Sequence, residues 1–180
     1  IGDTENLDQM LPLLAIRGFG QSEDQMVPLH MAMVASAVAN DGKMMKPYVI
    51  EATFDKAGRE LNRTEPEVWK MPISAETAAL ETEFMVGVVE SGTASCCLAL
   101  DGGIQAAAKT GTAELGIASN PDLSHAWIVA FAPAEDPQFA VSVVLTDVQS
   151  TQDVSATGGR LAGPIAETML NFLLTGQGAS

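Results

Sequence analysis

Apolar residues at helical spacing predict a buried helix that begins near Pro28. Pro28 lacks an N–H and suits a first helical turn, where that donor has no partner inside the helix. The apolar positions that follow it are Met31, Val34, Ala35 and Val38. Alanines and methionines between them leave almost no polar face, which is typical of a helix packed inside a protein. We expect the helix to end at the Asn-Asp-Gly turn of 40–42, and His30 to be a packed or capping side chain.

A second helix of about four turns is predicted to begin after Ser74, a residue type that caps helix N-termini. Glu76 in its first turn is favourable to the helix dipole. The apolar face that the spacing predicts consists of Leu80, Phe84, Val88 and Val89. The segment 90–94, Glu-Ser-Gly-Thr-Ala, is expected to end the helix, because glycine is the usual residue after a helix C-terminus.

Two apolar strands are predicted at 125–132 and 138–146, joined by the Pro-Ala-Glu-Asp-Pro segment of 133–137. One face of an antiparallel hairpin is commonly exposed to water, so strands that are apolar at nearly every position predict a sheet covered on both faces. The helix at 28–40 is the candidate for one face, and the segment from Gly158-Gly159 through Leu173 is the candidate for the other. The expected fold class is therefore α+β, an antiparallel sheet with helices on both faces.

The remaining segments are predicted to be smaller features. Residues 46–54 read as a strand, 55–58 as a turn, and the chain near Glu60-Leu61 as the partner of a surface hairpin. Residues 4–25 are polar with a short apolar insert at 10–16, and their closing segment, 17–22, is expected to form a turn or loop packed by Phe19 between two glycines.

Composition narrows the function classes. The chain has 180 residues, 47% of them hydrophobic, and this composition is ordinary for a globular domain. Its formal net charge of −14 argues against binding nucleic acid. No apolar run approaches the roughly 20 residues of a membrane helix. The two cysteines, Cys96 and Cys97, are adjacent; free or buried thiols are the favoured interpretation, with a vicinal disulfide as the alternative. With two histidines besides, no metal spacing is present and no metal or cofactor is expected.

The stretch with the most chemistry is Lys109-Thr110-Gly111-Thr112, which ends a strand expected after the turn at 101–103. It presents one cation and two hydroxyls, with a glycine between the hydroxyls where a side chain would block the backbone. A strand of this kind can dock an extended peptide. The four residues are weak evidence by themselves, and a polar strand end is the alternative.

The surrounding segments make the whole chain resemble the C-terminal half of the penicillin-binding transpeptidase domain, most closely the actinobacterial class B enzymes. The segments that carry the resemblance, in family order, are 20–21, 27–32, 39–42, 89–94, 109–114, 125–127, 158–159 and 163–165. The resemblance implies a β-lactamase/transpeptidase-like fold. It also implies that residues 1–180 are a partial domain, with the nucleophile in an N-terminal half outside this sequence.

The family cross-links peptidoglycan stem peptides through an acyl-enzyme, using a serine with lysine three residues later, a Ser-x-Asn turn and a Lys-Thr-Gly strand. In this sequence no serine has lysine at +3 or asparagine at +2, so only the third element is present. The resemblance implies that Lys109 supplies positive potential beside the substrate carboxylate, and that the hydroxyls of Thr110 and Thr112 bind that carboxylate. Gly111 would let the ligand pair with the strand, and the Thr112 N–H would be one of two oxyanion donors.

Other residues in the matching segments are interpreted as scaffold. Trp127 is expected in the core instead of a cleft, and His125 at a solvated strand edge. Ser91-Gly92-Thr93 is expected to cap a helix and not to supply a nucleophile. For Glu114, orientation of Lys109 and exposure to water are both left open.

The resemblance also implies partners and a location. These are stem peptides and β-lactams as ligands, the missing N-terminal half of the domain, a membrane glycosyltransferase of the cell-wall machinery, and the extracytoplasmic side of the plasma membrane. The alternatives that keep the fold are a non-catalytic penicillin-recognising sensor or scaffold, and a D,D-carboxypeptidase or β-lactamase. The 180 residues by themselves are expected to be inactive and weakly stable, because the sheet of the family takes part of its cover from the missing half.

Overall fold

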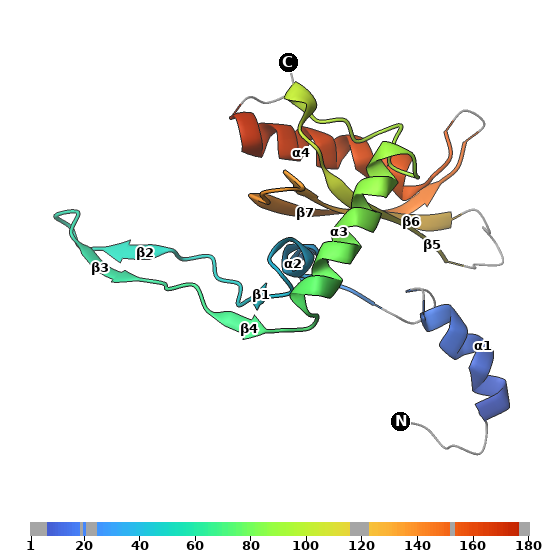
Figure 1. Cartoon of the computed structure of the whole chain (residues 1–180), viewed down its shortest axis with the longest axis horizontal. Helices are drawn as coiled ribbons and strands as arrows, with labels where there is room; N and C mark the ends of the chain where they lie inside the picture. Colours follow the sequence, from blue (N-terminus) through green and yellow to red (C-terminus); the bar gives the residue numbers. More distant parts are fainter. Residues whose placement is uncertain (1–6, 19, 21–24, 116–122, 152–153, 177–180) are drawn as a thin grey trace.

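The computed structural model describes residues 7–18, 20, 25–115, 123–151 and 154–176. Its centre is a three-stranded antiparallel sheet in the order β5-β6-β7, formed by Ala107–Glu114, Leu123–Ala132 and Phe139–Gln149 (Figure 1). The two strands predicted around 125–132 and 138–146 are therefore confirmed, and the Lys109–Thr112 strand is their neighbour. β5 lies at one edge of this sheet.

Helices cover both faces of the sheet, as the apolar strands predicted. On one face, α4 (Gly163–Thr175) and the π-helical turn η3 (Gly158–Ala162) pack Ala166 and Leu170 against Ile128 and Ala130. On the other face, α2 (Pro28–Ala39) packs against Val129 and Phe131 (Figure 1). α2 begins and ends where predicted, whereas His30 is exposed, so its interpretation as a packed side chain was wrong.

Helix α3 (Ala75–Glu90) runs past the start of β5 and contributes to both apolar cores. Ser74 caps it as predicted, its Oγ accepting the Thr77 N–H at 3.1 Å. The predicted apolar face was wrong in part, since Leu80 and Phe84 are 50% and 61% exposed. The buried positions include Ala78 and Met85, because α3 is rotated so that its small and flexible side chains meet the sheet edge.

An arm made of two short hairpin ladders extends from the body (Figure 1). β1 (Met44–Met45) pairs with β4 (Val68–Lys70), and beyond them β2 (Ala52–Phe54) pairs with β3 (Glu60–Arg63). The predicted strand over 46–54 is thus too long: residues 46–51 are not in a strand, and Pro47, which lacks an N–H, cannot donate to a ladder. The predicted turn at 55–58 is confirmed.

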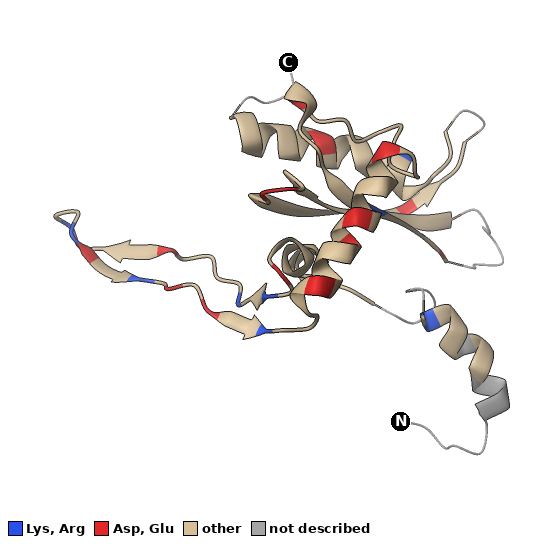
Figure 2. Ribbon diagram, in the orientation of Figure 1, with Lys and Arg blue, Asp and Glu red and all other residues tan. Residues whose placement is uncertain are grey.

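Asp55 organises that turn. Its carboxylate accepts the N–H groups of Ala57 and Arg59 at 2.8 and 2.9 Å and pairs with the Arg59 guanidinium at 2.7 Å. Hydrogen bonds from the Arg59 backbone and side chain lower the pKa of Asp55 below its usual value of 3.8. Basic and acidic positions both occur along the arm, whereas acidic positions dominate α3 (Figure 2).

Helix α1 (Leu7–Arg17), with Pro12 inside it, was not predicted; it contains the apolar insert at 10–16. Part of the loop expected at 17–22, including Phe19, lies outside the described residues. The favoured interpretation of the two cysteines was wrong. Cys96 and Cys97 form a vicinal disulfide instead of free thiols. Adjacent cysteines in a tight turn after a helix bring their sulfurs together without help from distant parts of the chain, which the spacing rule for disulfide frameworks does not consider.

Candidate substrate-binding strand

The Lys109–Thr112 segment occupies the part of β5 where the strand emerges from the core. Ala107 and Ala108 are fully buried, whereas Lys109 and Thr112 are exposed and Thr110 is half-buried. The sequence folds this way because alanines fill the narrow space beside α3, and polar residues begin where that cover ends. β5 has one ladder partner among the described strands, so its second edge is unpaired there.

The phase of the β5–β6 ladder determines which backbone groups point to that second edge. The N–H of Leu115 donates to Leu123 O at 3.0 Å, and residues two apart in an antiparallel strand share the same orientation. The backbone groups of Lys109 and Gly111 therefore face β6, and those of Thr110 and Thr112 face outward. The Lys109 ammonium donates to Thr110 O at 2.6 Å, which confirms that this carbonyl is accessible from outside the ladder.

The side chains of Thr110 and Thr112 lie on the sheet face that carries η3 and α4. Thr112 Oγ1 accepts the N–H of Gly158 at 3.4 Å, and Thr110 Oγ1 lies 2.6 Å from Thr93 Oγ1. Two hydroxyls on one face of a strand, two residues apart, can bind the same carboxylate. Lys109 and Gly111 face the opposite side of the sheet, since side chains alternate along a strand.

Two glycines let η3 lie directly on the backbone of β5 and β6. A Cβ at Gly158 would lie 2.0 Å from Trp127 O and 2.5 Å from Gly111 O. A Cβ at Gly159 would lie 2.1 Å from Thr93 O. Side chains at both positions are thus excluded by backbone atoms. The Gly158-Gly159 pair fixes the height of η3 above the strand.

The structure places the other predicted site residues as follows. Trp127 pairs across the ladder with Gly111 and is only half-buried, outside the two buried clusters, so the expectation of a core position is not met. His125 is not a solvated edge residue: it is half-buried, and its Nδ1 accepts the N–H of Asp147 at 3.1 Å where β7 bulges. Glu114 is exposed and lies on the face opposite Lys109, and no ion pair among the described residues joins the two.

Sequence reasoning missed Thr93 as a neighbour of the strand. Ser91-Gly92-Thr93 does end α3, with the Ser91 N–H bonded to Gly87 O, so the prediction of a helix end is confirmed. The same segment then delivers the Thr93 hydroxyl to Thr110. The available signal was that this segment was one of those carrying the family resemblance.

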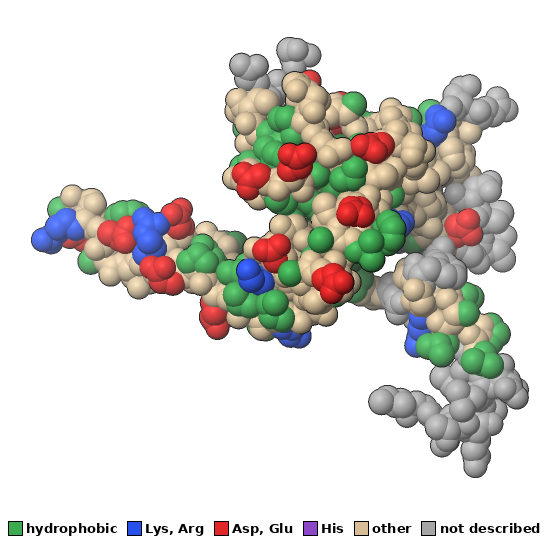
Figure 3. All heavy atoms as spheres, in the orientation of Figure 1, with side chains coloured by type: hydrophobic (Ala, Val, Ile, Leu, Met, Phe, Trp, Pro, Cys, Tyr) green, Lys and Arg blue, Asp and Glu red, His purple; other side chains and the backbone are tan. Residues whose placement is uncertain are grey.

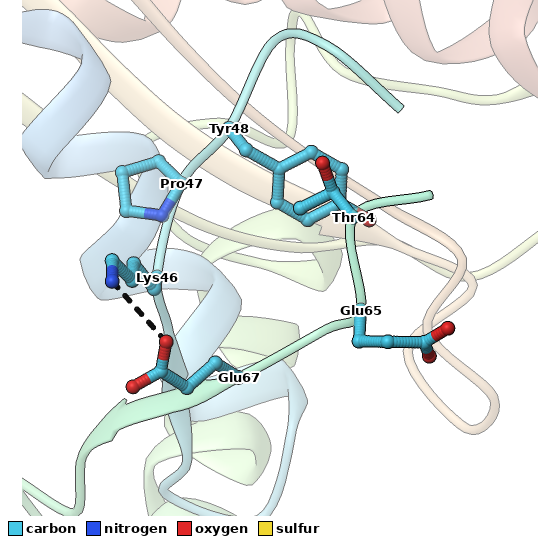
Figure 4. A pocket seen from close by; sticks show the side chains of 6 residues that line it. All are labelled: Lys46, Pro47, Tyr48, Thr64, Glu65 and Glu67. Carbon is cyan, nitrogen blue, oxygen red and sulfur yellow. Dashed lines mark hydrogen bonds and ion pairs between the residues drawn. The ribbon is translucent and has the colours of Figure 1, made fainter. Parts of the chain in front are cut away.

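A small pocket lies at the base of the arm. Its lining consists of Lys46, Pro47, Tyr48, Thr64, Glu65 and Glu67 (Figure 4). The Lys46 ammonium and the Glu67 carboxylate pair across it at 3.2 Å, and both are exposed. This pocket shares no residue with β5, and none of its lining residues belongs to the segments that carry the family resemblance. We therefore assign the candidate site to the strand.

Among the described residues, no cluster of three or more histidine, cysteine or acidic side chains is suited to hold a metal ion. None of the described helices has the length and apolarity to cross a bilayer.

The helix-covered antiparallel sheet with the Lys-Thr-Gly-Thr segment on its edge strand is the arrangement expected from the resemblance to penicillin-binding transpeptidase domains. The penicillin binding protein transpeptidase domain matches residues 12–171, and the chain belongs to that family.

Known relatives place it within the family. It is 38% identical over 157 residues to the peptidoglycan D,D-transpeptidase PbpA of Mycolicibacterium smegmatis, covering 87% of this chain and 31% of the relative. The PbpA of Mycobacterium tuberculosis is 34% identical over 164 residues, covering 91% and 32%. The penicillin G acyl-enzyme structure of M. tuberculosis penicillin-binding protein A superimposes with a TM-score of 0.76 at 34% identity, covering 90% of this chain and 35% of that one. The chain thus spans about a third of the length of these relatives.

Proposed function

We propose that this chain is the substrate-binding part of a peptidoglycan D,D-transpeptidase, and that β5 is the strand on which the stem peptide docks. The observation that carries the proposal is the unpaired outer edge of β5. Outward-facing backbone groups of Thr110 and Thr112 lie there beside an exposed ammonium and two hydroxyls on one face. An extended peptide added to this edge would gain main-chain hydrogen bonds and a cation for its carboxylate.

Each residue of the strand then has a role in binding the substrate. The hydroxyls of Thr110 and Thr112 bind the terminal carboxylate, and Lys109 supplies positive potential in a chain whose formal charge is −14. Gly111 keeps the strand free of a side chain where the ligand lies against it. The Thr112 N–H, which faces outward, serves as one donor to the oxyanion; loss of one such donor costs about 2.7–4 kcal/mol of transition-state stabilisation.

The nucleophile is supplied from elsewhere in the complete protein. No serine in this sequence has the lysine or asparagine partners that the family chemistry needs. Residues 1–180 are accordingly proposed to be the C-terminal part of the transpeptidase domain, inactive without the remainder. The cell-wall role further suggests action on the outer side of the plasma membrane, beside a glycosyltransferase that makes the glycan strands.

The proposal is tested by acylation of the complete protein with a fluorescent penicillin. The wild-type protein should be labelled, and Lys109→Ala should slow labelling while Lys56→Ala, a matched change in the exposed turn of the arm, should leave it unchanged. The 180-residue chain by itself should not be labelled. A labelled serine within residues 1–180, or equal rates for both lysine variants, would contradict the assignment.

A further inference from the structure

We propose that Thr93 is a positioning residue for transpeptidation, one that orients the Thr110 hydroxyl toward the substrate carboxylate. This role rests on the function proposed for β5. The observation behind it is the 2.6 Å separation of the two hydroxyl oxygens, which joins residues 17 positions apart. That is a full-strength hydroxyl–hydroxyl hydrogen bond.

The loop that carries Thr93 is fixed from several directions. The Ala94 N–H donates to Val88 O at 3.1 Å, and both Ser95 N–H and Ser95 Oγ donate to Gly92 O, at 3.2 and 2.8 Å. Ala94 is completely buried in the core under the sheet. These contacts hold the loop independently of Thr110. The position of Thr93 is therefore set by its own loop.

Thr110 is held on its second side by η3. A Cβ at Gly159 would lie 3.6 Å from the Thr110 methyl carbon and 2.1 Å from Thr93 O. The methyl group of Thr110 thus lies toward Gly159, and its hydroxyl lies toward Thr93. The rotamer that directs the hydroxyl to Thr93 is thus the one observed, with the methyl group on the side of Gly159.

The direction of the hydrogen bond follows from proton count. A threonine hydroxyl carries one proton. If Thr110 donates that proton to a carboxylate, its bond with Thr93 must be one in which Thr93 donates and Thr110 accepts. The resulting chain, Thr93 to Thr110 to carboxylate, polarises both hydroxyls and strengthens the contact with the anion. Without Thr93, the Thr110 hydroxyl loses the partner that fixes its rotation.

This role predicts a defect that depends on the ligand carboxylate. The test measures second-order acylation rates of the complete protein with a penicillin and with its methyl ester. Thr93→Val keeps the shape of the side chain and removes the hydroxyl, and it should lower the rate with free penicillin about tenfold, the loss expected for one hydrogen bond to a charge-assisted network. The rate with the ester should change less than twofold, and Thr93→Ser should recover most of the loss.

Two further variants separate positioning from structure. The double variant Thr93→Val/Thr110→Val should acylate at the rate of Thr110→Val, because Thr93 acts through Thr110. Thr168→Val is the matched control: its exposed hydroxyl bonds Pro164 O within α4, so its removal should leave the rate unchanged. Thermal unfolding of each variant identifies any loss of fold.

The outcomes distinguish the two proposals. Equal losses with penicillin and ester, additive losses in the double variant, or failure of serine to rescue would overturn the role of Thr93 while leaving the transpeptidase assignment intact. A wild-type complete protein that is not acylated would overturn the proposed function, and the role of Thr93 with it.

Discussion

Replacement of Gly158 by alanine should both destabilise the sheet and disturb the proposed site. The added Cβ would lie 2.0 Å from Trp127 O, 2.5 Å from Gly111 O and 3.0 Å from Gly111 N. All three are backbone atoms of two paired strands, so no flexible side chain can move aside. η3 must lift away from the ladder or the ladder must bend.

The expected cost in free energy of unfolding is about 1.5–4.5 kcal/mol. Forcing a methyl group into a packed interior costs about 1–3 kcal/mol. Lifting η3 also lengthens the bond from the Gly158 N–H to Thr112 Oγ1, already 3.4 Å, and loss of a hydrogen bond adds about 0.5–1.5 kcal/mol. Because Thr112 belongs to the proposed binding strand, acylation by penicillin should slow as well.

The control is Gly87→Ala in α3. An added Cβ there meets nothing within 4 Å, and alanine in a helix interior is more favourable than glycine by about 0.5–1 kcal/mol. Urea unfolding of the complete protein, followed by far-ultraviolet circular dichroism, gives both free energies. A Gly158→Ala protein within about 0.5 kcal/mol of wild type, the usual range of neutral surface changes, would refute the reasoning.

Four further expectations follow. Gly111→Ala should fold normally, because its Cβ would lie 3.4 Å from the Trp127 Cβ, yet slow penicillin acylation; a lower unfolding temperature would contradict the first half. The pKa of Asp55 is lower in the folded protein than its usual value of 3.8. Its contribution to the stability of the turn is therefore fully present above pH 3.8 and is lost as the pH falls through the lower pKa of the folded state. Amide exchange at Arg59 should therefore accelerate only in acid, and unchanged protection there would contradict this. A thiol reagent should modify Cys96 and Cys97 only after reduction; modification beforehand would contradict the disulfide. The 180 residues by themselves should unfold at low temperature, since α3 and the arm expose apolar side chains (Figure 3); a sharp, reversible, high-temperature transition would count against this.

The central fold was predictable from sequence because its signals are continuous. Most positions of β6 and β7 are apolar, and strands of this kind indicate a sheet whose two faces are both covered. The beginning of α2 at Pro28 and the cap of α3 at Ser74 follow from local chemistry. These features depend on residues close in sequence or on burial alone, and no knowledge of tertiary contacts is needed to infer them.

The errors share a different cause. Leu80 and Phe84 have helical spacing, but the direction in which α3 faces is set by its contact with β5, which the helix sequence does not contain. His125 was assigned to a solvated edge because the bulge that brings Asp147 to it depends on the register of β7. The Thr93–Thr110 contact likewise needs the relative position of two segments. Pairwise geometry of this kind is fixed only when the sheet, its cover and the loops assemble together.

Glycine is the residue through which these distant segments meet. Gly158 lies on the hydrogen-bonded pair of β5 and β6, and Gly159 lies against Thr93 O and the methyl of Thr110. A third glycine, Gly163, lies beside the carbonyl of Cys97: a Cβ at Gly163 would be only 2.7 Å from Cys97 O. Backbone contacts of this kind fix distances more tightly than long side chains do, because they have no rotamers to change. Main-chain packing thus fixes the β5 backbone that carries the two threonine hydroxyls, and it leaves the outer edge of the strand to the ligand.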